Sequence, residues 1–304
     1  MKNQTLVSII ISNYNYERFL NKAIDSALNQ TYENIEVIVV DDGSTDKSRE
    51  IISSYGNRVI SIYKDNAGQP SSYNTGFASS RGEIICFLDS DDMFLPSKVA
   101  EIVKIYNSYE EVGWYFHSLK VIDENDNPLD IIITRDYSSC ECDYRSFVEA
   151  GKIPPTVPPS SALCFKRSLL DKILPMPTAK VVPASDYYVK YMAVALSKGF
   201  ILAEDLTLQR IHGNNMATWR TDTQHMKARE QLFTGYWVRQ QFPHFRKFGN
   251  KLVGLGMALN WCSGNKDLEN SIIIDNYFSY SSLIERIKIF FIAFYYYTKA
   301  RITT

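Results

Sequence analysis

The sequence lacks an excess of either charge. Its 304 residues include 33 Lys and Arg against 34 Asp and Glu, which gives a formal net charge of −1. A near-neutral chain has no basic footprint for nucleic acid, so any phosphate that it binds must be held locally. With 45% hydrophobic and 22% charged residues, the composition is that of a globular protein and excludes disorder and collagen-like repeats. We expect one large domain with a C-terminal extension and no nucleic-acid partner.

Cysteine is scarce, and long apolar runs are absent. The cysteines are odd in number, and Cys140 and Cys142 are too close in sequence for an ordinary zinc pair; the full set is Cys86, Cys140, Cys142, Cys164 and Cys262. No apolar run reaches the roughly 20 residues that a membrane-spanning helix needs. The first residues do not have a secretory pattern. We therefore expect a cytoplasmic protein. Any membrane association would be peripheral, at the inner face of the membrane.

Residues 6–109 alternate short apolar runs with helical patterns, which predicts a doubly wound α/β sheet covered on both faces. Helical spacing of apolar residues predicts the first helix, at Leu20, Ala23, Ile24, Ala27 and Leu28. A short helix that ends at Tyr55 and another around 71–80 are also expected. The predicted strands are residues 7–11, 35–40, 59–63 and 83–88.

Beyond residue 110 the pattern is less regular. Residues 112–116 and 119–122 are candidate strands, the proline-rich stretch 154–159 predicts a surface loop, and 186–197 predicts a helix followed by a strand over 200–208. From about Thr221 the pattern is helical. We predict three parts: residues 1–110, residues 111–220 and a helical extension over 221–304.

Acidic residues follow two of the predicted strands. Asp41 and Asp42 follow the second strand, and Asp89, Asp91 and Asp92 follow the fourth. Ligands of an open parallel sheet bind beyond the carboxyl ends of its strands. Carboxylates gathered at one edge repel unless they are solvated, protonated or bridged by a cation. Each motif alone is more often structural, but the two together favour a Mg²⁺ or Mn²⁺ site.

The common phosphate-binding loops are missing. Residues 12–16 after the first strand contain neither a glycine-rich turn for a dinucleotide nor a Lys-bearing loop for a triphosphate. A sheet edge rich in acid and poor in base can accept a diphosphate through a metal that neutralises it. The sequence therefore predicts a metal-held nucleoside diphosphate.

A series of motifs in the first 110 residues lies at 7–15, 30–32, 36–46, 66–69, 74–76 and 82–92. In content and order these motifs resemble glycosyltransferase family 2, the large inverting family with the GT-A fold, of the bacterial surface-polysaccharide type. The resemblance implies that residues 1–110 are a nucleotide-sugar-binding half and residues 111–220 an acceptor-binding and catalytic half. The resemblance implies that Ser12 and Tyr14 lie against the nucleobase and that Asp42 accepts a hydrogen bond from it. Asp41 and Asn66 are assigned to the same donor site. Asp89 would face the ribose and the metal shell, and Asp91 would bind the metal directly.

Downstream the resemblance is thinner. Residues 159–167 look like the family's acceptor-side segment, and Asp186 occupies the place of the family's catalytic base. The alternative for Asp186 is a helix cap, and one residue can fill both roles. His212, within the motif 210–215, corresponds to a histidine that reaches the metal or diphosphate, although an isolated His is more often a packed or surface residue. The family often has a basic residue at the position of Tyr73, which puts a cationic phosphate contact there in doubt.

Together with the acidic strand ends, the resemblance implies a metal-dependent inverting glycosyltransferase. It would move a sugar from a nucleotide-diphosphate sugar to a hydroxyl of a saccharide or lipid-linked acceptor, with Asp186 as general base. A nucleotidyltransferase is disfavoured because it would have a glycine-rich basic loop after the first strand. A non-catalytic scaffold of a membrane-associated polysaccharide assembly is disfavoured by the intact acidic residues.

The C-terminal segment is unusually aromatic. Residues 287–297 are apolar or aromatic except for Lys288, and they are flanked by Arg286, Lys299 and Arg301. The segment is too short to span a bilayer. A helix resting on anionic lipid and a helix packed on the domain or on another subunit both fit this pattern. We therefore expect peripheral membrane contact or a homo-oligomer through residues 284–301.

Overall fold

The computed structural model describes residues 4–131, 138–155, 158–179, 186–213, 215, 224–264 and 267–302. The chain forms two compact units. The first, here called the sheet unit, comprises Met1–Asp143, Thr156–Thr178 and Leu196–Asn214. The second, here called the helical unit, comprises Tyr144–Pro155, Ala179–Ala195 and Asn215–Thr304. The division at residues 110 and 220 stays a prediction.

The first half of the sheet is parallel. Its strands are β1 (Val7–Asn13), β2 (Ile35–Asp41), β3 (Ile60–Tyr63) and β4 (Ile84–Asp89). β1 lies between β2 and β4, and its register places Asn13 beside Asp41 and Ser12 beside Asp89. The carboxyl ends of these strands therefore meet at one edge of the sheet, as the sequence predicts.

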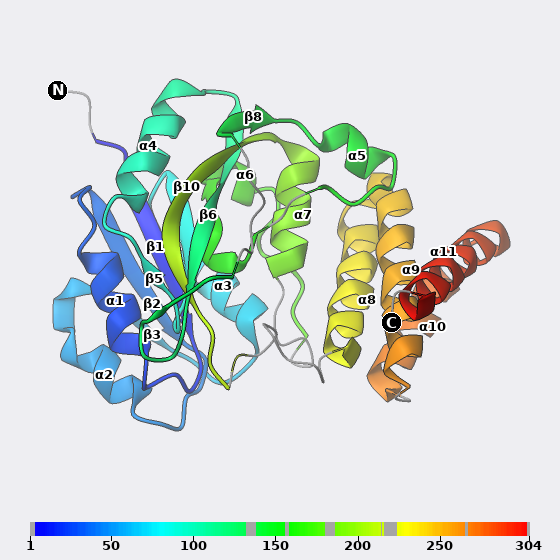
Figure 1. Cartoon of the computed structure of the whole chain (residues 1–304), viewed down its shortest axis with the longest axis horizontal. Helices are drawn as coiled ribbons and strands as arrows, with labels where there is room; N and C mark the ends of the chain where they lie inside the picture. Colours follow the sequence, from blue (N-terminus) through cyan, green and yellow to red (C-terminus); the bar gives the residue numbers. More distant parts are fainter. Residues whose placement is uncertain are drawn as a thin grey trace. The chain divides into compact units, whose positions relative to one another are not determined.

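Helices cover both faces of this half, as Figure 1 shows. The helices are α1 (Leu20–Leu28), α2 (Ser48–Ser54), α3 (Gln69–Ser79) and α4 (Lys98–Ser108). Ile9 and Ile11 pack in one cluster with residues of α1, α2 and α4. Ile10 points the other way, to Gly76 of α3, where an added Cβ would lie 2.4 Å from its side chain. Side chains alternate across a strand, so a wholly apolar run fits a sheet buried on both faces.

The second half of the sheet is mixed. It contains β5 (Met93–Phe94), β6 (Val112–Ile122), β7 (Pro128–Leu129), β8 (Cys140–Cys142), β9 (Leu163–Lys166) and β10 (Lys198–Arg210). The strand order is β3-β2-β1-β4-β9-β6-β10-β5, with β7 on β6 and β8 on β10. β6 and β10 are parallel, whereas β9 runs antiparallel to both β4 and β6. The predicted α/β class with a mostly parallel sheet is confirmed.

Several details of this half differ from the prediction. Residues 112–122 form one strand rather than two, because His117 and Ser118 are buried inside the sheet and continue the pairing with β10. The sequence does not predict the short strands β5, β7, β8 and β9, because runs of two to four residues carry too little periodicity to identify a strand. The pairing of β9 with β4 is, in addition, a long-range contact. Short elements beside these strands are η1 (Gly56–Arg58), η2 (Ser160–Ala162) and α6 (Arg167–Leu170).

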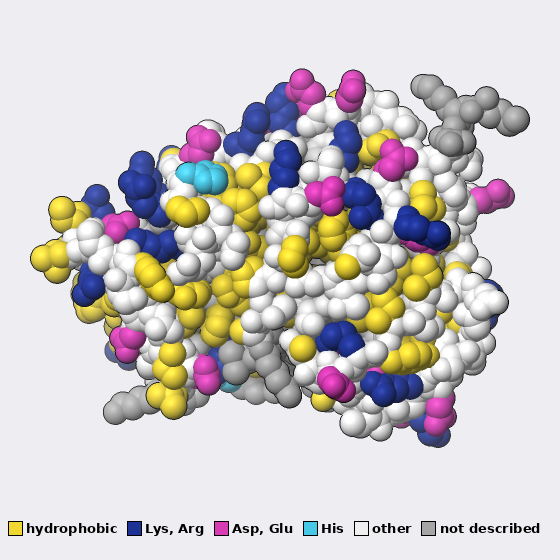
Figure 2. All heavy atoms as spheres, turned by 180° about the vertical axis from the view of Figure 1, so that it is seen from behind, with side chains coloured by type: hydrophobic (Ala, Val, Ile, Leu, Met, Phe, Trp, Pro, Cys, Tyr) yellow, Lys and Arg dark blue, Asp and Glu magenta, His cyan; other side chains and the backbone are white. Residues whose placement is uncertain are grey.

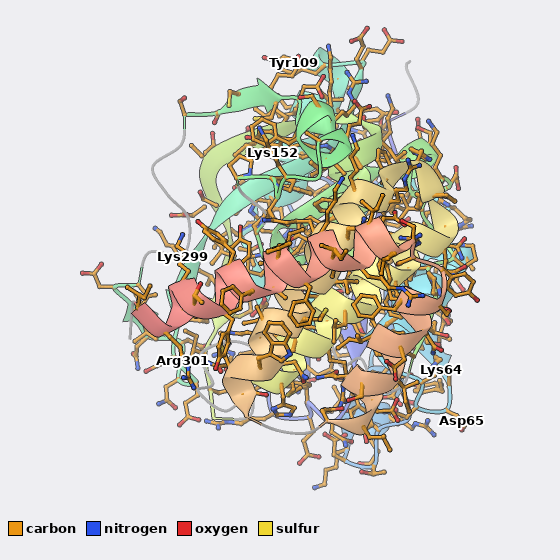
Figure 3. All side chains as sticks on the ribbon, turned by 90° about the vertical axis from the view of Figure 1, so that its right-hand side faces the viewer. Lys64, Asp65, Tyr109, Lys152, Lys299 and Arg301 are labelled. Atoms are coloured by element: carbon orange, nitrogen blue, oxygen red, sulfur yellow. The ribbon has the colours of Figure 1, made fainter. Side chains whose placement is uncertain are left out.

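The described part of the helical unit consists of helices, which confirms the predicted helical C-terminal region. They are α5 (Arg145–Glu149), α7 (Asp186–Leu196), α8 (Gln224–Gln241), η3 (Pro243–Phe245), α9 (Arg246–Ser263), α10 (Leu268–Ser279) and α11 (Leu283–Ile302). α11 crosses α9 at Gly254, where an added Cβ would lie 2.5 Å from Ile292 (Figure 3). Among the described residues, no helix is long and apolar enough to cross a membrane.

Candidate active site

Three carboxylates gather where β4 ends. One oxygen each of Asp89, Asp91 and Asp92 can be chosen so that all lie within 4.8 Å of one another. The chain turns sharply here, because the backbone N–H of Asp92 donates to the carbonyl of Asp89 at 3.1 Å. Like charges this close destabilise the fully ionised state unless a cation or proton compensates them. The arrangement is therefore suited to a cation.

Asp89 is held by groups from two other segments of the sheet unit. Gln69 Nε2, at the start of α3, donates to Oδ1 at 3.2 Å, and the Ser160 hydroxyl donates to Oδ2. The Asp89 backbone N–H donates to Ser161 Oγ at 3.0 Å. The turn η2 therefore fixes both the backbone and the side chain of Asp89.

Asp91 meets a histidine from the end of β10. His212 Nε2 lies 3.1 Å from Asp91 Oδ2, and its ring contacts Phe19 and Tyr16 at centroid distances of 4.7 Å and 5.6 Å. Burial, followed by the charges of Asp91, Asp89 and Asp92, raises the pKa of Tyr16 far above its usual range, so the phenol keeps its proton. The predicted metal residues Asp89, Asp91 and His212 thus lie together.

Asp92 is the deepest acid of the cluster. Burial raises its pKa well above the usual range, and the neighbouring charges of Asp91 and Asp89 raise it further. Its Oδ1 accepts a hydrogen bond from the backbone N–H of Arg210 at 2.8 Å. Asp92 therefore joins the end of β4 to the end of β10.

The side chain of Arg210 connects the segment of Asp91 to the segment of Asp123. Its guanidinium is fully buried, and it donates to the carbonyl of Asp91 at 2.9 Å and to that of Asp123 at 3.0 Å. It also forms an ion pair of 2.6 Å with Asp126 and lies over the Phe19 ring. Arg210 thus fixes the backbone that carries Asp91.

At the second acidic strand end, where β2 ends, the carboxylate of Asp41 is occupied by hydrogen bonds within the protein. Asp41 is fully buried, and its carboxylate accepts hydrogen bonds from Asn13, Arg49 and the backbone N–H of Ser44 at 2.8–3.1 Å. Burial alone would raise the pKa of Asp41, but the hydrogen bonds from Ser44, Arg49 and Asn13 bring it below its usual value. In the structure Asp41 joins the ends of β1 and β2, while its assignment to the donor stays a prediction.

Asp42 organises the loop before α3. Its oxygens accept hydrogen bonds from the backbone N–H groups of Ala67 at 3.0 Å and Gly68 at 2.7 Å, and from Lys64 Nζ. The next residue, Gly43, has φ +83°, and a Cβ there would lie 2.6 Å from the backbone nitrogen of Asn66. The structure therefore brings Asp42 and the loop of Asn66 together, and Gly43 permits the close approach.

Two further predicted residues lie at the carboxyl end of β1, Ser12 within the strand and Tyr14 just beyond it. Ser12 pairs with Asp89 in the sheet, and Tyr14 is 42% exposed just beyond the strand. Asn15 then adopts φ 59°, and its side chain accepts a hydrogen bond from the Thr45 backbone at 2.8 Å. An exposed aromatic ring beside the acidic edge is consistent with a base-stacking role, which stays a prediction.

Asp186 begins α7 in the helical unit. Its Oδ2 accepts from Lys190 Nζ at 2.9 Å, and that ammonium lies 3.9 Å from the ring centroid of Tyr187. Burial alone would lower the pKa of Lys190, but the charge of Asp186 raises it above the usual value. Burial, and then the charge of Asp186, raises the pKa of nearby Glu230 to about 8. Ala184 and Ser185, which precede Asp186, lie outside the described residues, as does Asn214 of the motif around His212.

Several contributors were missed in the sequence. Ser160 and Ser161 lie in a segment assigned to the acceptor side, and only the placement of η2 beside β4 shows that they hold Asp89. In the sequence, Asp92 is one of several acids at the strand end, and Arg210 is one residue of the motif 210–215. A buried Arg cannot be distinguished from an exposed one by sequence, and the polar pair Ser160-Ser161 among apolar neighbours was the only available signal.

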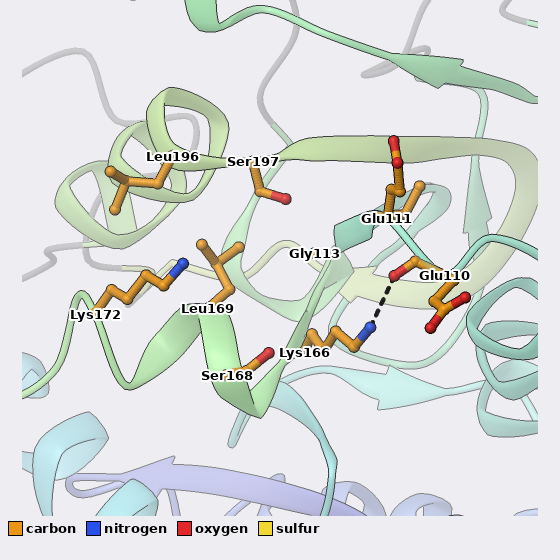
Figure 4. Close-up of a pocket in the computed structure, with 10 residues that line it drawn as sticks. Glu110, Glu111, Gly113, Lys166, Ser168, Leu169, Lys172, Leu196 and Ser197 are labelled. Atoms are coloured by element: carbon orange, nitrogen blue, oxygen red, sulfur yellow. Dashed lines mark hydrogen bonds between the residues drawn. The ribbon is translucent and has the colours of Figure 1, made fainter.

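A small pocket of the sheet unit lies elsewhere. Figure 4 shows it at the amino ends of β6 and β10, with Glu110, Lys166, Lys172 and Ser197 among its lining residues. Lys166 Nζ donates to the carbonyl of Glu110 at 2.9 Å across it. Its volume of about 160 Å³ is below the usual range for a small-molecule site. The acidic cluster is at the opposite, carboxyl ends of the strands, so the pocket is not part of that site.

Comparison with known proteins gives the class. Residues 8–173 match the family model described as glycosyl transferase family 2. An uncharacterized glycosyltransferase of Nostoc sp. is 37% identical over 230 residues, covering 74% of this chain and 71% of the relative. One from Rickettsia typhi is 32% identical over 235 residues, covering 76% and 71%. The chain belongs to glycosyltransferase family 2.

Solved structures support the same fold. Residues 1–349 of S. aureus TarS, in complex with UDP-GlcNAc, align with a TM-score of 0.63 at 17% identity, covering 88% of this chain and 78% of that one. The chain covers 43% of a longer TarS chain. Mannosyltransferase PcManGT from Pyrobaculum calidifontis, in complex with GDP-Man and Mn²⁺, aligns with a TM-score of 0.57 at 16% identity, covering 95% and 79%. At these identities the likeness concerns the fold, which is the predicted GT-A fold.

Proposed function

We propose that this chain transfers a sugar, with inversion, from a nucleotide-diphosphate sugar to a hydroxyl of a saccharide or lipid-linked saccharide used in surface polysaccharide. The observation that carries the proposal is the clustering of Asp89, Asp91 and Asp92 at the carboxyl edge of the sheet in a family 2 chain. A diphosphate leaving group needs local neutralisation, and a near-neutral chain does not provide it through net charge. The acidic cluster can provide it by holding a cation.

The residues at this edge fit a divalent metal ion. Mg²⁺ and Mn²⁺ prefer carboxylate oxygens, and imidazole nitrogen is also acceptable to Mn²⁺. Asp91 and Asp89 would hold the ion, with His212 on Asp91. Burial, and then the charges of Asp91 and Asp89, raise the pKa of Asp92, and a cation would relieve the repulsion among these charges. The bound ion would neutralise charge that develops on the leaving diphosphate. PcManGT, which shares the fold, is in complex with Mn²⁺.

The donor nucleotide would lie along the same edge. Ser12 lies in β1 and Tyr14 lies just beyond it. Asp41 ends β2, Asp42 follows it, and Asn66 is in the loop that Asp42 holds. In this proposal the exposed ring of Tyr14 covers the base and Asp42 accepts a hydrogen bond from it. Asp42 already binds two backbone N–H groups, so its orientation is fixed before a ligand arrives.

The chemical step assigned to Asp186 is proton removal. Asp186 accepts the proton of the acceptor hydroxyl while the oxygen forms a bond to the anomeric carbon from the face opposite the diphosphate. The bond from the anomeric carbon to the diphosphate oxygen breaks, so the nucleoside diphosphate leaves and the configuration inverts. The buried Lys190 holds one oxygen of Asp186, which orients the carboxylate.

The test is a panel of nucleotide sugars, read out first by thermal unfolding with and without Mn²⁺ and then by release of nucleoside diphosphate. One donor should raise the melting temperature only when the metal is present. Asp91→Asn should abolish that shift, whereas Asp171→Asn, which changes an exposed acid outside the cluster, should keep it. Donor-dependent stabilisation without any release of diphosphate in the presence of varied acceptors would instead indicate a binding or scaffolding protein.

A further inference from the structure

Helix α11 has two distinct long faces. One face packs inward on α9, with Ile289 and Ala293 fully buried and Ile292 against Gly254. With about 100° between successive residues of a helix, the opposite face is set by positions 284, 287, 291, 294, 295, 298 and 302. Apart from Thr298, this outward strip is formed by large apolar or aromatic side chains, namely Ile284, Ile287, Phe291, Phe294, Tyr295 and Ile302.

The outward strip is exposed. Phe291 is 70% exposed and Phe294 is 56% exposed, and each of the other apolar members is at least 48% exposed, while Thr298 is half-buried. Single exposed apolar residues are common, but a contiguous row along a helix marks an interaction surface. Figure 2 shows hydrophobic side chains together with Lys and Arg at the left edge, where α11 of Figure 1 lies after the half-turn.

Basic residues border the strip on both sides. On the same helical wheel Lys288 and Lys299 lie along one border, and Arg286 and Arg301 lie toward the other. All of these side chains are exposed. In Figure 3, Lys299 and Arg301 are on opposite sides of the α11 ribbon.

The single acid of α11 faces away from the strip. Glu285 lies within 3.5 Å of Arg239, another residue of the helical unit, and is largely buried there. The outer surface of α11 therefore combines an apolar centre with cationic margins. Such a surface suits a layer with an apolar interior and anionic head groups, because long basic side chains can reach the head groups while the rings enter the acyl boundary.

A second copy of the chain fits this surface less well. A twofold contact through the strip would bring the basic borders of two copies together, since both borders are cationic, and like charges repel. We propose that the outward strip of α11 docks in the plane of an anionic lipid bilayer. The aromatic side chains enter the interface, and Lys288, Lys299, Arg286 and Arg301 contact lipid phosphates. This role is independent of the proposed transfer reaction.

The experiment is flotation of the full chain with vesicles of phosphatidylcholine alone or of phosphatidylcholine mixed with phosphatidylglycerol. Wild type should bind the mixed vesicles, with binding that weakens as salt rises, and should not bind neutral vesicles. The double variant Phe291→Ser with Phe294→Ser should lose at least about tenfold in partitioning. Phe147→Ser, at an exposed ring outside α11, is the matched control and should bind like wild type.

The contribution of the basic residues to vesicle binding is tested with two double lysine variants, one on α11 and one outside it. Lys288→Gln with Lys299→Gln should lower partitioning into anionic vesicles by about fivefold per charge. Lys104→Gln with Lys172→Gln removes the same net charge from exposed sites of the sheet unit and should have little effect. Circular dichroism melting curves check that each variant is folded.

Two results would overturn the proposal. One is equal binding of neutral and anionic vesicles, or equal loss in both lysine pairs. The other is a lipid-free wild type that sediments as a dimer, becomes monomeric in the double Phe variant and does not bind vesicles, which would show that a second copy covers the strip.

Discussion

His212 Nε2 lies 3.1 Å from Asp91 Oδ2 although 121 positions separate the two residues in the chain. The contact joins the end of β10 to the turn after β4, and the buried Arg210 fixes both backbones at that point. In the proposed metal site, His212 would act either as a ligand or by orienting the carboxylate of Asp91. The two roles give different mutational results.

Replacing His212 tests its role. His212→Ala should weaken Mn²⁺ binding by about 10- to 100-fold, because loss of a ligand or of its orienting partner has effects of this size. His212→Gln can still donate to Asp91 and should restore most of the affinity if His212 only orients Asp91. Calorimetric titration of Mn²⁺ measures both variants. Wild-type affinity in His212→Ala would remove His212 from the metal site.

Replacing Asp186 separates chemistry from binding. Asp186→Asn should reduce turnover by about 10²- to 10⁴-fold, because the amide cannot accept the acceptor's proton. The donor dissociation constant should remain near that of wild type, since the assigned role concerns the acceptor. Steady-state kinetics and donor titration provide the two numbers, and Asp275→Asn on α10 is the control. Near-normal turnover in Asp186→Asn would assign the proton transfer to another residue.

Gly43 should be required for stability. Gly43→Ala places a Cβ 2.6 Å from the Asn66 backbone at φ +83°, so we expect a loss of about 2–4 kcal/mol. Gly56→Ala also has a positive φ, of +54°, but no atom lies within 4 Å of its added Cβ. It should lose only about 1 kcal/mol. Urea unfolding followed by circular dichroism measures both, and equal losses would show that the contact with Asn66 has no energetic effect.

The pKa of about 8 for Glu230 implies a pH dependence of stability. Between its ordinary pKa of 4.5 and about 8, Glu230 is ionised in the unfolded chain but protonated in the folded one. Unfolding then releases a proton, so this group's contribution to stability falls as pH rises through that window and levels off above pH 8. The effect is on the order of a few kcal/mol, because each pKa unit corresponds to about 1.4 kcal/mol.

Glu230→Gln should remove this slope. The variant should therefore gain stability relative to wild type as pH rises, as measured by urea unfolding across a pH series. Glu269→Gln, at an exposed carboxylate of α10, should retain the wild-type slope. Parallel curves for wild type and Glu230→Gln would show that Glu230 is ionised in the folded protein.

Local patterns were sufficient for the elements with strong periodicity. The apolar runs of β1, β2 and β4, the helical spacing of α1 and the extent of α7 all follow from side-chain pattern, which local backbone geometry fixes. The merging of 112–122 into one strand depended on burial of His117 between neighbouring strands. The antiparallel insertion of β9 between β4 and β6 depended on pairing between distant segments.

The sequence by itself determined the family, the α/β class and the acidic residues at the strand ends, because these depend on residue type and spacing. Only the tertiary structure decided which acids cluster. It separated Asp41, whose oxygens are occupied by Asn13, Ser44 and Arg49, from the group of Asp89, Asp91 and Asp92. It also placed His212 and the η2 serines on that group. The physical reason is that burial and hydrogen bonding between segments far apart in the chain set the electrostatics of a carboxylate, and neither is encoded in its immediate neighbours.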